Sequence, residues 1–180
     1  MTYPLSALIA PLWRMLPIRH QRSPLSGEGA RLYGGRWNPR GTPALYLATD
    51  AVTAVAEFYQ GLPKPGTLAP YQLDASAIAD LTDGKAAPAD RRIAAALGEP
   101  WKAVAARTGG EPIAWALARE LIRAGAEGAL VPSAQNPGGI NLVLWRWFDP
   151  ADAPKLAQGE EGAALRLLDP DKALQPYDRN

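Results

Sequence analysis

The sequence has no cysteine and only one histidine, His20. Without cysteine the chain forms no disulfide, holds no thiolate-bound metal and has no cysteine nucleophile. A single histidine cannot supply a histidine pair for a metal site, so we predict no bound metal. A Ser-His-Asp triad would have to use His20, and the Gly-x-Ser-x-Gly turn that presents such a serine does not occur.

Long apolar runs are also lacking. None approaches the roughly 20 residues that a membrane span requires. Pro4 and Pro11 interrupt the first apolar stretch and no basic residue precedes Arg14, so we predict no signal peptide, no membrane contact and a cytoplasmic location. The hydrophobic fraction of 47% in 180 residues is typical of a globular chain and predicts one domain over residues 1–180.

Charge is nearly balanced, at +1, but it is unevenly distributed. Residues 1–48 hold six arginines and one acid, Glu28, and the first lysine is Lys64. Residues 149–180 hold seven acids and four basic residues. Arginine forks bind phosphate oxygens in a bidentate way that ammonium groups cannot. The N-terminal cluster therefore indicates either a phosphate-binding site or a basic surface face.

Strand and helix signals follow one another without a regular rhythm. Strands are predicted over 12–16, 44–48, 70–73, 78–81, 128–131, 140–148 and 165–168. Helices are predicted over 51–60, 88–97, 100–107 and 111–124. This order favours an α+β fold with two small, mostly antiparallel sheets and flanking helices. Residues 17–43 read as a long loop, and because such loops are usually functional we expect a cleft bordered by residues 27–41.

The densest segment of the chain is Ser-Gly-Glu-Gly-Ala-Arg-Leu-Tyr-Gly-Gly-Arg-Trp-Asn-Pro-Arg-Gly at residues 26–41. It is not a dinucleotide fingerprint, because Leu32 stands where the third glycine belongs. The Gly-Lys-Ser/Thr of a P-loop is absent from the sequence. Any phosphate held here is therefore bound by arginines and turn amides.

Several motifs together resemble the RES-domain toxins. They are Gly-Glu-Gly-Ala at 27–30, Gly-Gly-Arg-Trp-Asn-Pro at 34–39, Pro-x-x-Tyr-x-Ala at 43–48, a helix carrying a glutamate, Val-Pro-Ser at 131–133 and Asn-Leu-Val-Leu at 141–144. The resemblance covers about 12–148 and leaves 149–180 as a C-terminal extension. It implies an ADP-ribosyltransferase-like fold, NAD⁺ as the substrate and an Xre-type antitoxin as the partner.

The resemblance also implies roles for individual residues. Glu57, Arg36 and Tyr46 match the family's catalytic glutamate, arginine and tyrosine, and Ser133 matches its serine. The residues expected to bind NAD⁺ are Arg36, Tyr46, Ser133, Arg14, Arg31 and Asn141. The matches of Arg14 and Asn141 are looser than the others.

Cleavage of NAD⁺ at the nicotinamide–ribose bond suits these residue types. Nicotinamide is already a cationic leaving group, so the reaction needs no strong general acid. The ribose passes through an oxocarbenium-like state, which a carboxylate such as Glu57 stabilises. Arg36 suits the pyrophosphate and Tyr46 can border the nicotinamide ring. The ADP-ribose acceptor stays open between a protein, water and phosphate, so transferase, glycohydrolase and phosphorylase activities are all possible.

Other interpretations remain open at this point. Arg36 and Trp37 can form a cation–π pair that supports a turn, and Tyr46 can be an ordinary core residue. Val52, Val55, Ala56 and Tyr59 predict the buried face of the helix over 51–60, and Glu57 points away from that face. The alternative functions are a non-catalytic interaction domain and a basic–aromatic nucleic-acid module using Arg31, Tyr33, Arg36, Trp37 and Arg40. Near-zero net charge disfavours nucleic acid as a partner.

Overall fold

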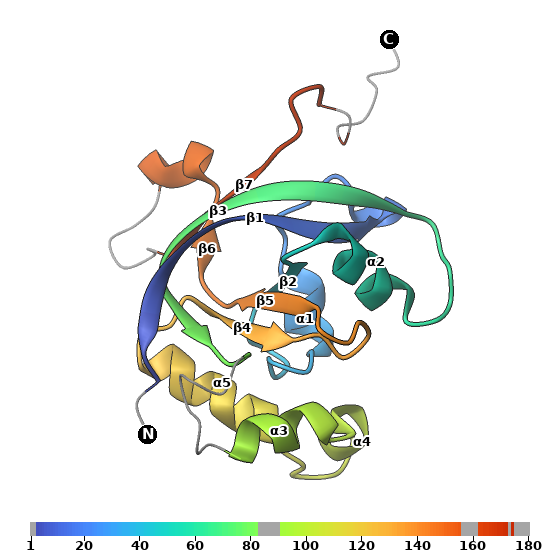
Figure 1. Ribbon diagram of the computed structural model, residues 1–180, viewed down its shortest axis with the longest axis vertical. Coiled ribbons are helices and arrows are strands. Elements are labelled where there is room, and N and C mark those ends of the chain that lie inside the picture. The colour runs from blue at the N-terminus through green and yellow to red at the C-terminus, as the bar shows by residue number, and fades with distance from the viewer. Residues whose placement is uncertain (1–2, 83–90, 156–161, 173, 175–180) are drawn as a thin grey trace.

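Seven strands form one sheet within residues 3–82, 91–155, 162–172 and 174, the part of the chain that the computed structural model describes (Figure 1). The strands are β1 (Leu5–Pro17), β2 (Leu45–Ala48), β3 (Gly66–Asp80), β4 (Gly128–Pro132), β5 (Ile140–Leu144), β6 (Trp147–Phe148) and β7 (Ala163–Leu167). The helices are α1 (Glu28–Tyr33), α2 (Ala51–Tyr59), α3 (Arg91–Gly98), α4 (Trp101–Ala105) and α5 (Ile113–Arg123), with 3₁₀ turns at η1 (Ile18–His20) and η2 (Pro150–Lys155).

The sheet curls into a closed ring, so the prediction of two small sheets is wrong although the α+β class holds. The strand order is β1-β2-β5-β4-β3-β7-β6, and β1 pairs with β3 as well as with β2. Five strands therefore make a barrel, and β7 and β6 extend from it. Most pairings are antiparallel, as expected, and only β3–β4 and β6–β7 are parallel. The closure rests on the long pairing of β1 with β3 (Figure 1).

Strand β3 is one continuous strand, where two short strands around a turn were expected at 70–73 and 78–81. Asp74 and Ser76 lie between the two expected strands, and both are exposed and alternate with the buried Leu73 and Ala75. This two-residue period is that of a strand with one face in the core. The predicted strand over 140–148 differs in the opposite sense. It breaks into β5 and β6 where the backbone N–H groups of Trp145 and Arg146 both donate to the Glu127 carbonyl.

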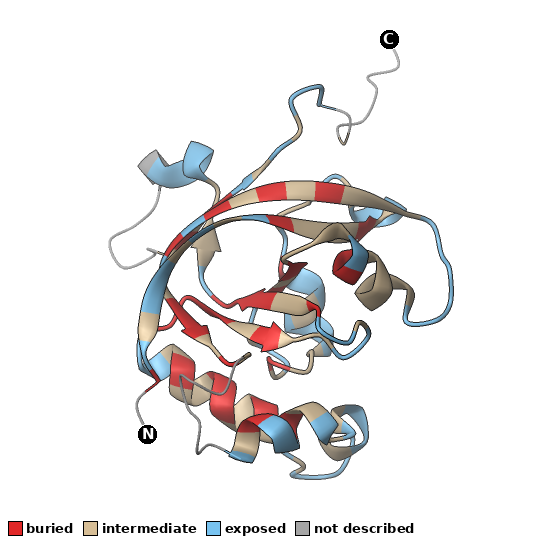
Figure 2. Cartoon of the chain, viewed as in Figure 1, coloured by how far each residue is buried: buried red, intermediate tan, exposed pale blue. Residues whose placement is uncertain are grey.

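Two hydrophobic cores hold the fold together (Figure 2). The first fills the barrel and includes Leu12, Leu16, Leu45, Tyr71, Leu73, Leu142 and Leu144. The second lies between the barrel and helices α3 and α5. Helix α5 contributes Ala114, Leu117, Ala118 and Leu121 to it, and these residues recur with the helical period on one face. No described helix is long and apolar enough to cross a membrane.

The segment 17–43 is more ordered than the predicted loop, because it holds η1 and α1. Side chains from the barrel fix its course. The Pro24 carbonyl accepts hydrogen bonds from Arg14 Nη1 at 3.0 Å and from the Tyr71 hydroxyl at 2.9 Å. The Leu25 carbonyl accepts from the indole of Trp147 at 2.9 Å. These contacts hold the arginine-rich segment across one end of the barrel.

Candidate active site

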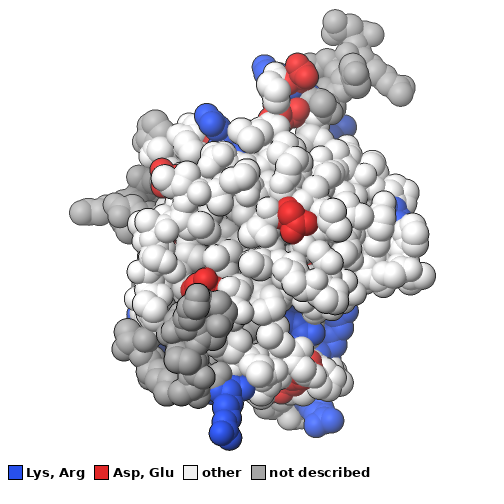
Figure 3. Space-filling model, viewed as in Figure 1, with Lys and Arg blue, Asp and Glu red and all other residues white. Residues whose placement is uncertain are grey.

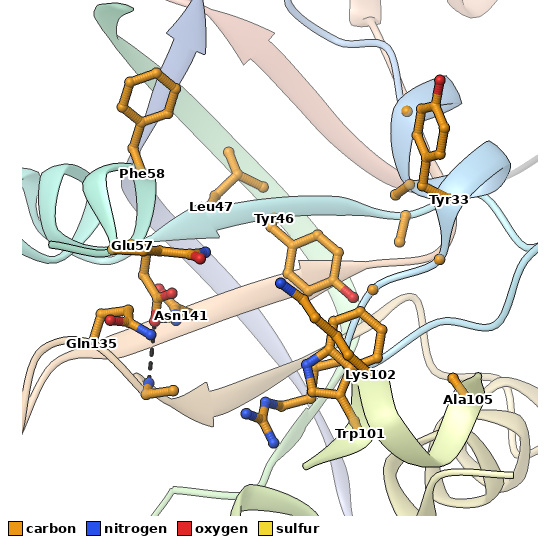
Figure 4. Close-up of a pocket in the computed structure, with 18 of the residues that line it drawn as sticks. Tyr33, Tyr46, Leu47, Glu57, Phe58, Trp101, Lys102, Ala105, Gln135 and Asn141 are labelled. Atoms are coloured by element: carbon orange, nitrogen blue, oxygen red, sulfur yellow. Dashed lines mark hydrogen bonds between the residues drawn. The ribbon is translucent and has the colours of Figure 1, made fainter. Parts of the chain in front are cut away.

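A cavity of about 1160 Å³ opens between the barrel and helices α1, α2 and α4 (Figure 4). Its walls come from distant parts of the chain. They include Arg14 of β1, Tyr33 of α1, Gly35, Arg36 and Arg40 of the following loop, Tyr46 of β2, Glu57 of α2, Trp101 and Lys102 of α4, and Asn141 of β5. The expected cleft beside residues 27–41 is therefore present, and one cavity gathers most of the predicted site residues.

Helix α2 brings Glu57 into this cavity. The helix begins at Ala51 because the Asp50 side chain accepts a hydrogen bond from the Thr53 N–H at 2.8 Å. Its buried residues are Thr53 and Ala54, whereas Val52 is 70% exposed. The predicted apolar stripe through Val52 was thus wrong. The packed face lies next to Glu57, which explains how a glutamate on this helix reaches the site.

One oxygen of the Glu57 carboxylate collects three hydrogen bonds. Oε1 accepts from the Ser133 hydroxyl at 2.6 Å, from Asn141 Nδ2 at 2.7 Å and from the Ala134 N–H at 3.1 Å. Among the described residues, none donates a hydrogen bond to Oε2. The carboxylate is therefore fixed in place through one oxygen while the other stays available. Ser133 and Asn141, predicted to bind NAD⁺, both contact Glu57 directly.

A second layer of contacts holds the loop that carries Ser133. The Ser133 hydroxyl accepts from the N–H groups of Gln135 and Asn136, at 3.2 and 3.0 Å. Asn136 Nδ2 donates to Thr53 Oγ1 at 2.8 Å, and Thr53 Oγ1 donates to Asp50 at 2.6 Å. A side chain at Gly139 would collide with Thr53 Oγ1. The loop 133–139 and helix α2 are thus joined through Thr53, which is fully buried.

Arg36 lines the cavity and also holds its far wall. Its Nη1 donates to the carbonyls of Ala96, Leu97 and Glu99, at 2.9, 3.1 and 3.2 Å. These carbonyls end helix α3, where a cation is favoured by the helix dipole. Nε and Nη2 have no hydrogen-bond partner among the described residues and can bind an anion. Arg36 is therefore a structural cation and a candidate ligand at once.

Tyr46 and Asn38 build the turn that presents Arg36. The Tyr46 hydroxyl donates to Asn38 Oδ1 at 2.7 Å and accepts from the Trp37 N–H at 3.0 Å. Burial raises the pKa of the Tyr46 hydroxyl well above its ordinary value, so it stays protonated and keeps donating. Gly35 packs so closely on this hydroxyl that any side chain there would collide with it. The Tyr46 ring faces the cavity while its hydroxyl is committed to the turn (Figure 4).

The predicted arginines do not all reach the cavity. Arg14 and Arg40 line it, and burial lowers the pKa of Arg14. Arg31 is exposed, is absent from the cavity wall and forms an ion pair with Glu28 at 2.5 Å. Hydrogen bonding to Arg31 lowers the pKa of Glu28. Arg31 thus points to solvent, and its predicted role in binding NAD⁺ gains no support from its position.

Charged side chains lie scattered over the face shown in Figure 3, and uncharged surface separates them. The blue groups that are visible do not form a continuous stripe on this face, although nucleic-acid binding relies on clustered basic charge. Trp37, one of the aromatics proposed for such a surface, is 2% exposed. The nucleic-acid interpretation therefore loses one of its five residues to the core.

Three residues that the sequence analysis missed prove central to this site: Asn38, Thr53 and Asn136. Asn38 is fully buried, and its Nδ2 donates to the carbonyls of Ala30 and Thr42 at 2.9 Å and to that of Pro39 at 3.2 Å. The Gly-Gly-Arg-Trp-Asn-Pro run contained Asn38, but only Arg36 and Trp37 were singled out within it. Thr53 lies in the helix predicted over 51–60, but nothing in the sequence showed that its side chain binds Asn136.

A known protein family matches most of the chain. The RES domain matches residues 11–167. The chain belongs to the RES-domain family. The matched residues run beyond the expected core of 12–148 and include β7.

The chain is similar over shorter stretches to named RES-domain relatives. It is 48% identical over 46 residues to Toxin Res of Photorhabdus laumondii subsp. laumondii, which covers 26% of this chain and 30% of that protein. It is 37% identical over 62 residues to Toxin Res of Yersinia enterocolitica, covering 34% and 41%. It is 45% identical over 56 residues to the NAD(+) phosphorylase MbcT of Mycobacterium tuberculosis, covering 31% and 30%. The chain thus spans well under half the length of these curated relatives.

A solved structure shares the fold over most of the chain. It is the crystal structure of the M. tuberculosis MbcT-MbcA toxin-antitoxin complex, with a TM-score of 0.56 and 24% sequence identity. The alignment covers 92% of this chain and 84% of that one. At this identity the likeness establishes the α+β fold alone.

Proposed function

We propose that this RES-domain protein is the toxin of a toxin–antitoxin pair and that it cleaves NAD⁺ at the nicotinamide–ribose bond. The observation that carries the proposal is the Glu57 carboxylate, held through Oε1 by Ser133, Asn141 and the Ala134 N–H, while no described residue donates to Oε2. A carboxylate fixed in this way meets a developing positive charge without reorganising. The relative called Toxin Res supports the role as a toxin, and the one called NAD(+) phosphorylase MbcT supports a reaction on NAD⁺.

In the proposed reaction the bond between ribose C1′ and the nicotinamide nitrogen breaks. The bonding electrons leave with nicotinamide, which becomes neutral, and positive charge develops on the ribose C1′ and ring oxygen. Oε2 of Glu57 stabilises this charge or holds a ribose hydroxyl. An acceptor oxygen then bonds to C1′. Phosphate gives ADP-ribose 1″-phosphate, water gives ADP-ribose with release of a proton, and a protein side chain gives an ADP-ribosylated target.

We propose inorganic phosphate as the acceptor, because one relative is named a phosphorylase. The cations that line the cavity are Arg14, Arg36, Arg40 and Lys102, which suits a substrate with a pyrophosphate. Nε and Nη2 of Arg36, which have no hydrogen-bond partner in the described part of the chain, offer one bidentate contact.

The partner in this proposal is an Xre-type antitoxin. A protein that consumes NAD⁺ harms the cell that makes it, so a neutraliser must accompany it. The simplest block is an anionic group that occupies the phosphate position beside Arg36 or Arg14. The complex should then fail to bind NAD⁺, and removing the inserted antitoxin segment should restore NAD⁺ consumption without dissolving the complex.

The test is incubation of the purified chain with NAD⁺, with and without phosphate, followed by mass identification of the products. We expect nicotinamide release that requires phosphate, with ADP-ribose 1″-phosphate as the second product. A parallel incubation with labelled NAD⁺ and cell lysate detects transfer to protein. Free ADP-ribose as the product would show that water is the acceptor in place of phosphate. Labelled protein would show that a protein side chain is the acceptor. No loss of NAD⁺ under any condition would contradict the proposed function and favour a non-catalytic interaction domain.

A further inference from the structure

The six tryptophans of this chain differ in what their indole N–H groups do. Three of them hold the fold together through backbone carbonyls. Trp115 donates to Gly35, Trp145 to Trp37 and Trp147 to Leu25, each at 2.9 Å. Such hydrogen bonds mark tryptophans whose position is structural.

Trp101 has no such task. It begins α4 and lines the cavity, it is only partly buried, and its indole N–H has no hydrogen-bond partner among the described residues. A large aromatic side chain at a cavity wall offers a flat surface to a ligand. The ammonium of Lys102, which also lines the cavity, lies over the Trp101 ring at 5.7 Å from its centre, so a base that stacks on this ring uses the opposite face.

Trp101 lies on the side of the cavity away from Glu57 and Asn141 (Figure 4). Glu57 and Asn141 form one end, and Tyr46 lies between them and Trp101 in the close-up (Figure 4). Arg36 binds the carbonyl of Glu99, two residues before Trp101, at 3.2 Å. Glu57 and Trp101 therefore lie on opposite sides of Tyr46 (Figure 4), and Arg36 contacts the segment that leads into Trp101. NAD⁺ has a matching order of nicotinamide ribose, pyrophosphate and adenosine.

We infer that Trp101 stacks on the adenine of NAD⁺ and makes the enzyme select a dinucleotide over a mononucleotide, with the Lys102 ammonium beside the adenosine phosphate. This inference rests on the proposed function. Stacking of a base on an aromatic side chain contributes enough affinity to change binding about 5- to 150-fold. The interaction lies far from the bond that breaks, so its loss weakens binding of NAD⁺ and leaves nicotinamide mononucleotide unaffected.

The first experiment compares kcat/KM for NAD⁺ and for nicotinamide mononucleotide, which has the same scissile bond and no adenosine. Trp101→Leu should lower kcat/KM for NAD⁺ about 5- to 150-fold and leave the value for the mononucleotide unchanged. Trp101→Phe, which keeps an aromatic face, should recover most of the NAD⁺ value. The control is Arg107→Ala, an exposed residue just after α4 and outside the cavity wall, which should match the wild type on both substrates.

Two results would overturn the inference. An equal loss on both substrates would mean that Trp101 serves the nicotinamide half or supports the cavity as a whole. No loss on either would mean that adenine binds elsewhere. Thermal unfolding of each variant shows whether a loss of activity comes from misfolding. Trp101→Phe is a second test variant, for which we expect a smaller loss on NAD⁺ than for Trp101→Leu.

A binding measurement separates this inference from the proposed activity. Calorimetry in a Glu57→Gln background, with ADP-ribose and ribose 5-phosphate as probes, requires no cleavage. Trp101→Leu should weaken ADP-ribose binding about 5- to 150-fold and leave ribose 5-phosphate unaffected. If ADP-ribose binds in this way but no NAD⁺ is cleaved by the wild type, only the proposed function fails. If ADP-ribose does not bind, or binds equally well to Trp101→Leu, the inference fails.

Discussion

The two ends of the cavity are built by opposite means. At the Glu57 end, Ser133, Asn141 and the Ala134 N–H all donate to one oxygen of the carboxylate. No described residue donates to the other oxygen. At the Arg36 end, the Arg36 side chain holds backbone carbonyls at the end of α3, and the Asn38 side chain holds those of Ala30 and Thr42. At the Glu57 end, the groups that hold the carboxylate in place are therefore different from the oxygen that acts on the substrate. At the Arg36 end, the same side chains hold the fold and face the substrate. Substitutions should separate activity from stability at the first end only.

The largest effect should come from Glu57→Gln. The amide preserves an oxygen for the three donors and removes the charge that faces the ribose, so kcat should fall roughly 10²- to 10⁴-fold with Tm nearly unchanged. Steady-state kinetics and thermal unfolding measure both quantities. Glu99→Gln is the matched comparison, because Glu99 also lines the cavity but its carboxylate caps α5 by accepting from the Ile113 N–H at 2.8 Å. Glu99→Gln should lower kcat far less than Glu57→Gln. Equal losses of kcat in the two variants would contradict the catalytic role of Glu57.

Asn38→Ala should show the structural character of the other end. The substitution leaves the Ala30 and Thr42 carbonyls and the Tyr46 hydroxyl without their buried partner. At about 1–3 kcal/mol for each unsatisfied group, partly offset by water, we expect the free energy of unfolding to fall by about 2–4 kcal/mol. Denaturant titration measures this. Tyr46→Phe removes only the hydroxyl and should cost less, so a larger loss from Tyr46→Phe would contradict the assignment of Asn38 as the centre of the turn.

Arg36→Lys should impair binding and stability together. Lysine keeps the charge but loses the planar fork, so it cannot hold the α3 carbonyls and a phosphate at the same time. We expect NAD⁺ affinity to weaken by about 1.5–3 kcal/mol, with a lower Tm. Calorimetry on the Glu57→Gln background gives the affinity. A lower Tm with unchanged affinity would make Arg36 a purely structural cation.

Thr53→Val should give the smallest effect, through Glu57. The change keeps the side-chain shape and removes the hydroxyl that joins Asp50 to Asn136. Because the loop 133–139 then holds Glu57 less firmly, kcat should fall about 5-fold, as for the loss of one hydrogen bond, while KM stays the same. Thr53→Ser keeps the hydroxyl and should restore kcat. A change in KM alone would show that Thr53 acts on binding instead.

Local sequence signals predicted the elements of this fold better than their assembly. The Asp50 cap and the apolar stripe of α5 are visible within one or two turns of sequence, and both helices formed as expected. The closure of the barrel depends on the long pairing of β1 with β3, which joins Pro17 to Gly66 and Leu5 to Ala79. No local pattern reports such a pairing, so two separate sheets were expected where one sheet closes on itself.

The candidate site shows the same limit. Family resemblance singled out Arg36, Tyr46, Glu57 and Ser133, but their roles depend on partners far along the chain. Ser133 reaches Glu57 across 76 residues and Arg36 reaches Ala96 across 60. The helical period alone placed Glu57 away from the core, and only the packing of Thr53 and Ala54 turned it toward the cavity. Arg31 illustrates the converse, since its nearest acid lies three residues away and holds it at the surface.

The central claim is that this cavity binds NAD⁺ with its nicotinamide ribose at Glu57. The most direct measurement is a crystal structure of the Glu57→Gln variant soaked with NAD⁺. It should show intact NAD⁺ with ribose C1′ facing the side chain at position 57, beside Ser133 and Asn141, and with the pyrophosphate on the free nitrogens of Arg36. NAD⁺ bound with its nicotinamide ribose away from position 57, or an empty cavity at saturating NAD⁺, would contradict the account.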